Sequence, residues 1–211
     1  MSRAAHPIRA LGPVLPGGAM AVLRGALLCL ALPALALPTL AQPLLAEGTA
    51  PGLPGDILEP PLELAEAGIY CPADHVAREP APDTESGYIL LTDENPELAL
   101  STRVVPAYIG ISFGIRIRLA PDTPPGPYVL TVRHPPVGPR QVTVESWNPA
   151  LDSRWGVRSF NFEFDRELVT GTWTFEVSQG DELLLRQSFQ VVQPMQAPEA
   201  IDICFGNTFL S

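Results

Sequence analysis

The chain has 211 residues, 46% of them hydrophobic, which is enough for one domain with a substantial core. Its formal net charge is −10 and its pI is about 4.7, so nucleic acid and anionic lipid are poor partners. The 25 prolines concentrate in the N-terminal third and between expected strands, where a proline costs no hydrogen bond of a sheet.

Residues 1–41 have the pattern of a secretory signal peptide, because three arginines precede an apolar run and small residues follow it. We expect cleavage after Ala41. Translation could begin at Met1 or at Met20, and the second start gives a signal of ordinary length. The apolar run has roughly 13 residues and a bilayer requires ~20, so we expect no membrane span after cleavage.

The sequence divides into four expected parts. They are a signal peptide (1–41), a flexible leader rich in proline and glycine (42–61), a single β-sandwich domain (62–205) and a C-terminal tail (206–211). Cleavage removes three arginines and no acidic residue, which leaves 10 arginines against 23 acidic residues, a formal charge of −13. An acidic surface of this kind keeps an exported protein soluble.

The clearest pattern lies in residues 160–192, where apolar side chains recur at every second position. This spacing predicts three extended segments of one antiparallel unit with a single apolar face. The turn between the last two segments, residues 178–181, contains Gly180, which supplies the positive φ of a short hairpin. The apolar positions are Phe160, Phe162 and Phe164, then Trp173, Phe175 and Val177, then Leu183, Leu185, Phe189 and Val191.

Residues 109–119 form the cleanest expected strand, with apolar residues alternating with Gly110, Gly114, Arg116 and Arg118. A glycine inside a strand indicates a bend or the close approach of another backbone. We expect the next strand, residues 128–133, to fold back on this one as a hairpin.

About nine short extended segments are separated by turn signals, and no convincing amphipathic helix of ten residues or more is present. This pattern predicts an all-β antiparallel sandwich of about 7–9 strands. Residues 171–191 look like the last two strands of an immunoglobulin-like sandwich.

The chain also resembles DUF3859, a family of exported bacterial domains of unknown function. The resemblance covers roughly residues 64–192 and implies an immunoglobulin-like fold and export, without a known reaction or ligand. It rests on Gly68-Ile69-Tyr70, Val105-Pro106-Ala107 before Ile109-Gly110 and Phe113-Gly114, Glu145-Ser146-Trp147, and the run from Gly171 to Val177.

Cys71 and Cys204 are the two cysteines left after signal cleavage. In an oxidising compartment they are most simply one disulfide that ties the end of the domain to its first strand. The alternative is a catalytic or metal site made from Cys71 and His75.

Other chemical sites receive little support from the sequence. No serine lies in a Gly-x-Ser-x-Gly elbow, and His134, expected in a loop, has no evident catalytic partner. The acidic loops 74–85 and 93–97 lack the ligand spacing of an EF-hand calcium loop. We therefore expect no cofactor, no metal and no enzyme activity.

The loop from Trp147 to Trp155 is the best candidate for recognition, because two tryptophans and Arg154 within nine residues provide a platform for a sugar ring or a peptide. The alternative is that the indoles fold back and close one end of the sandwich. That alternative is favoured for Trp147, and the two readings of Trp155 are balanced.

A second candidate surface consists of Arg116, Arg118 and Arg133, which the expected hairpin would place on one sheet face, ready for an acidic partner. Pairing of these arginines with neighbouring carboxylates is the ordinary alternative.

The sequence as a whole favours an exported, non-catalytic binding or accessory module of the cell envelope, with an envelope protein or a glycan as ligand. A small periplasmic hydrolase and a structural or chaperone-like subunit that binds through a sheet edge remain the alternatives.

Overall fold

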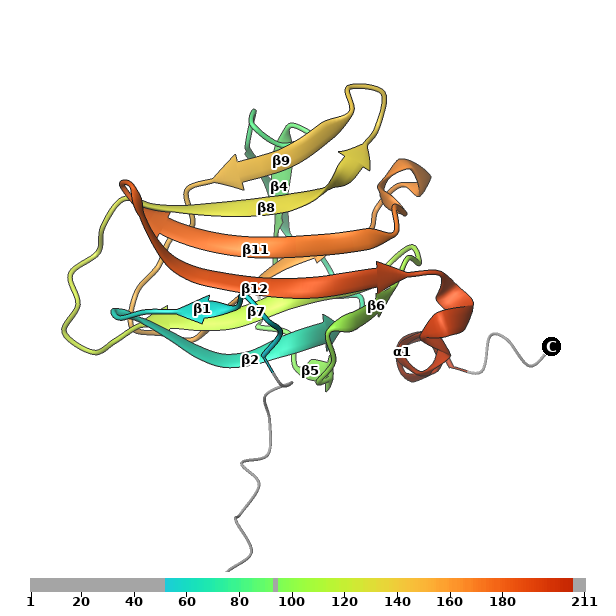
Figure 1. The fold of residues 1–211 in the computed structure, drawn as a ribbon, viewed down its shortest axis with the longest axis horizontal. Helices are drawn as coiled ribbons and strands as arrows, with labels where there is room; N and C mark the ends of the chain where they lie inside the picture. The colour runs from blue at the N-terminus through green and yellow to red at the C-terminus, as the bar shows by residue number, and fades with distance from the viewer. Residues whose placement is uncertain (1–51, 93–94, 207–211) are drawn as a thin grey trace, which may run out of the picture. The chain divides into compact units, whose positions relative to one another are not determined.

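The computed structural model describes residues 52–92 and 95–206, in which two largely antiparallel sheets pack face to face (Figure 1). Sheet A has six strands: β1 (Ile57–Leu58), β12 (Glu182–Val192), β11 (Gly171–Gln179), β8 (Tyr128–Val137) and β9 (Val142–Trp147) in spatial order, with β6 (Val104–Pro106) parallel to β12. Sheet B has four: β10 (Gly156–Asn161), β7 (Ser112–Leu119), β2 (Leu62–Tyr70) and β5 (Leu98–Leu100). A separate hairpin contains β3 (Ala77–Pro80) and β4 (Tyr88–Leu91).

The space between the sheets is filled largely by aromatic rings that surround Phe113 of β7. Its ring centroid lies 5.4–6.1 Å from those of five other rings, several of them in edge-to-face geometry. These partners come from both sheets and from residue 162, just after β10, and are Phe160, Phe162, Trp173, Phe175 and Phe189. The alternating aromatic residues of the sequence therefore form the core, as expected of an immunoglobulin-like sandwich, except Phe164, which lies beyond the end of β10 and outside this cluster.

Strand β7 has the predicted alternation, with its apolar residues buried and its arginines on the outer face. It begins three residues later than expected, because Gly110 adopts a φ of +87° in a turn that precedes it. Gly114 allows the close approach of β10, since a Cβ built there would lie 2.1 Å from the carbonyl oxygen of Arg158. The strand thus accommodates its neighbour only with glycine at this position.

Two predicted pairings are wrong. Strands β7 and β8 do not form a hairpin, because the connection between them contains four prolines in residues 121–127 and crosses from sheet B to sheet A. The Phe160 strand, β10, does not join β11 and β12, since it pairs with β7 in sheet B. Alternation shows which face of a strand is apolar. It does not show to which sheet the strand belongs, because the strands of both sheets have an apolar inner face.

The hairpin of β11 and β12 is confirmed, with Gly180 at a φ of +58° in its turn. A bulge after Val177 shifts the register, and Leu184 is buried where Leu183 was expected. One inward-facing position of β12 holds a polar side chain, Gln187, which is buried. There it accepts a hydrogen bond from buried Arg103, which is also paired with Asp56 at 3.5 Å.

The segment before β2 differs from the expected flexible leader. Strand β1 pairs with β12, and the Asp56 carboxylate accepts a hydrogen bond from the Ser188 N–H at 2.9 Å. The sandwich therefore begins several residues before the expected boundary at residue 62. The predicted signal peptide and the first part of the leader lie outside the described residues.

The helical elements are short: η1 (Asp165–Glu167), η2 (Pro194–Gln196) and α1 (Pro198–Phe205). Helix α1 packs Ala200 and Ile201 into the domain. Its Cys204 is joined to Cys71 at the start of the segment that follows β2, with 5.0 Å between the two Cα atoms. The predicted disulfide is confirmed, and a catalytic or metal site that needs a free Cys71 thiol is incompatible with it.

Candidate binding groove

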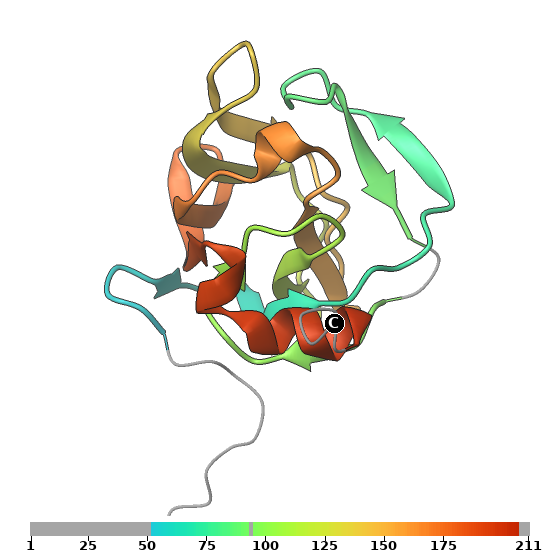
Figure 2. The same ribbon diagram turned by 90° about the vertical axis from the view of Figure 1, so that its right-hand side faces the viewer.

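The β3–β4 hairpin crosses the side of the sandwich on which β9 and β10 are the edge strands of their sheets (Figure 2). We call residues 77–91 the strap. Between the strap and the sandwich lies a groove of about 520 Å³. Every residue of β4 and every residue of β10 contributes to its lining. The groove therefore separates two strands that are far apart in the sequence.

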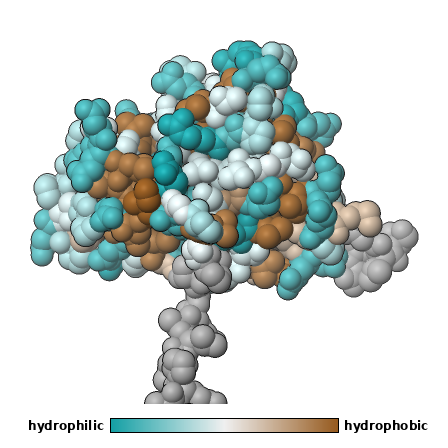
Figure 3. All heavy atoms as spheres, in the orientation of Figure 1, coloured by the Kyte–Doolittle hydropathy of each residue, from teal (hydrophilic) through white to brown (hydrophobic). Residues whose placement is uncertain are grey.

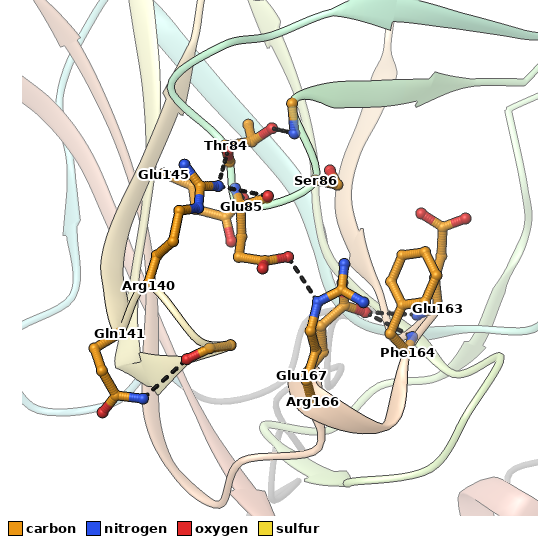
Figure 4. Close-up of polar contacts among 12 residues, drawn as sticks. Thr84, Glu85, Ser86, Arg140, Gln141, Glu145, Glu163, Phe164, Arg166 and Glu167 are labelled. Atoms are coloured by element: carbon orange, nitrogen blue, oxygen red, sulfur yellow. Dashed lines mark hydrogen bonds and ion pairs between the residues drawn. The ribbon is translucent and has the colours of Figure 1, made fainter.

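The tip of the strap is fixed to the sandwich by side chains of the β8–β9 connection, of β9 and of η1 (Figure 4). Arg140 donates hydrogen bonds to the carbonyl oxygens of Thr84 and Glu85 at 3.1 and 2.5 Å. The Glu145 carboxylate accepts one from the Glu85 N–H at 3.1 Å, and Arg166 pairs with the Glu85 carboxylate at 2.9 Å. Because several elements hold this one loop, the tip has a defined position relative to the groove.

Beyond the strap, the chain is attached to the start of β10 through Asn95. Its side-chain nitrogen donates to the Trp155 carbonyl oxygen at 2.9 Å, and its side-chain oxygen accepts from the Val157 N–H at 3.2 Å. Arg116 adds a hydrogen bond to the carbonyl oxygen of Pro96 at 2.6 Å. The strap is thus held at its tip, and the chain that follows it is held at Asn95 and Pro96.

The floor of the groove next to η1 is acidic. The Glu167 carboxylate is buried and accepts hydrogen bonds from the N–H groups of Glu163 and Phe164 at 2.7 and 3.0 Å. Burial raises the pKa of Glu167 above its ordinary value, an effect that these hydrogen bonds only partly offset. Across the groove, the Tyr88 hydroxyl lies 3.4 Å from the Glu163 carboxylate.

Charge in the groove is predominantly negative. Five carboxylates and two arginines line it, and Arg154 is already paired with Asp152 at 2.7 Å. Arg158 directs its guanidinium to the carbonyl oxygens of Val157 and Ala150, and burial lowers its pKa. The carboxylates are Glu79, Glu145, Asp152, Glu163 and Glu167. A ligand with positive charge is therefore electrostatically favoured.

The three residues predicted for recognition in the 147–155 loop all line this groove. Trp147 is half-buried and packs against the core, as the alternative reading expected for it. Trp155 is also half-buried, with the Arg118 guanidinium 4.3 Å from its ring centroid. Arg154 is 88% exposed at its side chain. Their role in binding stays a prediction, but their convergence on one cavity is a finding.

The second candidate surface does not exist as expected, because its arginines lie in different sheets. Arg116 and Arg118 belong to β7 and pair with Glu66 and Glu63 of β2, each at 2.6 Å. Arg133 belongs to β8 in sheet A and shares Glu176 with Arg186, at 2.7 and 2.9 Å. Burial acts to raise the pKa of Glu176, yet the hydrogen bonds from both arginines prevail and lower it. Each of these arginines is thus paired with a carboxylate.

His134 is not a loop residue. It lies on β8 with no exposed side-chain surface, stacks on Trp173 at 4.5 Å, and contacts the Glu145 carboxylate at 3.2 Å. This position gives it a structural role in holding Glu145, which in turn binds the strap. His75, the other histidine of the described residues, lines the groove.

Sequence reasoning missed the strap and the residues that converge on it. The four residues of β3 are all exposed, so they carry no alternating pattern, and the sequence indicated only the acidic loop 74–85 there. Asn95 and Glu163 gave no signal either, because their roles depend on β10. Asn95 belonged only to the expected acidic loop 93–97.

The described part of the chain contains no group of three or more His, Cys, Asp or Glu side chains arranged to hold a metal ion. None of its helices is long and apolar enough to cross a membrane. On the face seen in Figure 1, hydrophobic surface is broken into separate patches by hydrophilic residues (Figure 3). The groove is thus a more defined candidate than any apolar patch on that face.

A family model described as a domain of unknown function, DUF3859, matches residues 58–191 and confirms the resemblance. Among solved structures, the chain is similar to an immunoglobulin-like protein from Pseudomonas aeruginosa, at 23% identity and a TM-score of 0.42. That match covers 65% of this chain and 96% of the other. No curated protein matches the sequence.

Proposed function

The chain belongs to the DUF3859 family, and we propose that it is an exported, non-catalytic binding module of the cell envelope whose ligand lies in the groove under the strap. The observation that carries this proposal is the cavity of about 520 Å³ between β4 and β10. Its volume is within the range of small-molecule sites, and strands form its two walls.

The construction of the groove supports binding. Arg140 and Glu145 hold the tip of the strap by hydrogen bonds, and Asn95 binds the start of β10, so a ligand would meet a surface that is already ordered. A preformed site binds more tightly because less conformational entropy is lost on association. Trp147 and Trp155 offer large apolar surfaces, the property that makes tryptophan common at binding sites.

Export is supported by the disulfide between Cys71 and Cys204, since such bonds persist in oxidising compartments. The charge pattern of residues 1–41 supports it independently. For a protein of the envelope, we propose a protein segment or a glycan as the ligand. The acidic lining disfavours nucleic acid and anionic lipid.

An affinity experiment tests the proposal. The mature protein is immobilised and exposed to envelope extract, in parallel with the variants Tyr88→Ala and Trp155→Ala, which change opposite walls of the groove. Met195→Ala is the control, because that side chain is 85% exposed on η2 and does not line the groove. We expect the wild type and the control to retain the same ligand and both groove variants to lose it. Equal retention by all four proteins would disprove the groove as the site.

A further inference from the structure

The edge of β10 that faces the groove has backbone groups available for pairing. In an antiparallel strand, alternate residues direct both N–H and C=O to the same neighbour. The Phe162 N–H bonds to the carbonyl oxygen of Ile111, just before β7, and the outward N–H of Val157 bonds to Asn95. Ser159 and Asn161 share the orientation of Val157. Within the described residues, their groove-facing N–H and C=O groups form no hydrogen bond.

Strand β4 lies on the opposite side of this groove and runs antiparallel to β10. Tyr88 at its start reaches Glu163, which follows the end of β10, while Asn95 beyond its end contacts Trp155 and Val157. The Ala81 N–H donates to the Gly87 carbonyl oxygen, so Ala81 and Gly87 are a hydrogen-bonded pair. Because hydrogen-bonded pairs alternate along an antiparallel ladder, the N–H and C=O groups of Leu90 point away from β3. Figure 2 shows β4 between β3 and the sandwich.

The side chain of Asn95 makes hydrogen bonds that a neighbouring strand would make to β10. Its amide group binds the Trp155 carbonyl oxygen and the Val157 N–H, the two outward groups that an added strand would bind at that position. The next outward groups along β10, on Ser159 and Asn161, would bind the continuation of such a strand.

We propose that an extended peptide segment of a partner protein binds in the groove as an added strand beside β10, through the backbone of Ser159 and Asn161. This inference rests on the proposed function and names its ligand class. Addition of a strand to a sheet edge obtains affinity from main-chain hydrogen bonds and specificity from pockets for alternate side chains.

The groove also specifies the side chains of that peptide. Glu163 and Glu167 at the η1 end, together with Glu79 on the strap, favour a lysine or arginine. Trp155 at the other end favours an aliphatic or aromatic residue. The strap restricts access to the edge, which protects β10 from indiscriminate pairing with other strands.

Random heptapeptides displayed on phage and selected on the folded mature protein provide the probe. The best peptide is then measured by calorimetry against wild type, Ser159→Pro and Ser159→Ala. Proline removes an N–H that β7 does not use, whereas alanine retains it. We expect proline to weaken binding about tenfold, through one lost main-chain hydrogen bond and one unsatisfied carbonyl, while alanine changes it by less than about twofold.

A second measurement needs no variant. The peptide should slow amide hydrogen exchange at Ser159 and Asn161 of the wild type, and should leave exchange at Phe160, which faces β7, unchanged. The inference is overturned if no peptide is selected, if Ser159→Pro binds as well as wild type, or if the two amides are not protected.

The outcomes also separate this inference from the function on which it rests. Binding of N-acetylglucosamine hexamers that depends on Trp155, without any peptide, would leave the groove as the site and identify a glycan as its ligand. Peptides that bind equally well to Tyr88→Ala and Trp155→Ala would reject both the inference and the groove.

Discussion

The guanidinium of Arg118 lies over the indole ring of Trp155, 4.3 Å from its centroid. Arg118 is itself held by Glu63 at 2.6 Å, so a residue of β2 fixes a residue of β7, which supports an aromatic side chain at the mouth of the groove. The indole is therefore positioned by neighbours on the outer face of sheet B. This arrangement is intermediate between an exposed platform and a side chain packed in the core.

The arrangement predicts different costs for replacing the two tryptophans. Trp155→Ala should destabilise the protein by about 1 kcal/mol, because it removes one cation–π contact and a partly exposed ring. Trp147→Ala should cost about 2–3 kcal/mol, since that ring packs against the core. Urea denaturation midpoints provide the measurement. An equal loss of stability in both variants would show that Trp155 is a core residue.

The disulfide should be a major source of stability. The separation of 133 residues between Cys71 and Cys204 gives an entropic contribution of about 5 kcal/mol in the chain-entropy treatment, and measured values are often smaller. Reductant should therefore lower the melting temperature of the mature protein clearly. The double variant Cys71→Ala/Cys204→Ala should melt lower and be insensitive to reductant. Two freely alkylatable thiols in protein purified without reductant would refute the bond.

Gly114→Ala should disrupt the pairing of β7 with β10. The added methyl group would lie 2.1 Å from the Arg158 carbonyl oxygen, a backbone atom that cannot move without displacing its strand. We expect a loss of about 3 kcal/mol, at the upper end for overpacking of a core. Gly52→Ala is the matched control, since its methyl group would meet no atom closer than 3.6 Å. Equal melting temperatures for the two variants would contradict this account of β7.

The buried carboxyl of Glu167 predicts a pH dependence. Its pKa is higher in the folded than in the unfolded state, chiefly through burial, so its contribution to stability is greatest below its ordinary value of 4.5. That contribution is lost as the pH rises through the folded pKa.

Glu167→Gln keeps an oxygen acceptor for the two backbone N–H groups and removes the charge. The variant should be at least as stable as wild type at pH 7.5, and its relative stability should decline toward pH 4. Thermal melts at the two pH values test this. A variant clearly less stable at pH 7.5 than at pH 4, relative to wild type, would show that the charge itself is required.

The sequence predicted the parts of the fold that depend on local pattern. Alternating residues identified β7, β11 and β12, and the two cysteines that follow the expected signal peptide predicted the disulfide. The choice of sheet for β10 could not be predicted, because the side chains of Phe160 and Phe162 could face the core from either sheet. That choice is made by contacts with Phe113 and by the space left at Gly114, both distant in sequence.

The candidate site was predicted in part for the same reason. The 147–155 loop connects the two sheets at the edge where the groove lies, so its tryptophans marked the correct region. The opposite wall could not be predicted. The position of β4 depends on Arg140, Glu145 and Arg166 binding one loop, and each of these residues reads alone as an ordinary surface charge.

Hydrogen exchange measured by mass spectrometry, with and without envelope extract, tests the central claim most directly because it requires no knowledge of the ligand. If the groove is the binding site, slower exchange should appear in segments 88–92 and 156–163, which form its two walls, and not on the outer face of sheet A. Protection confined to β11 and β8, or equal exchange throughout at saturating extract, would contradict the assignment of the groove as the site.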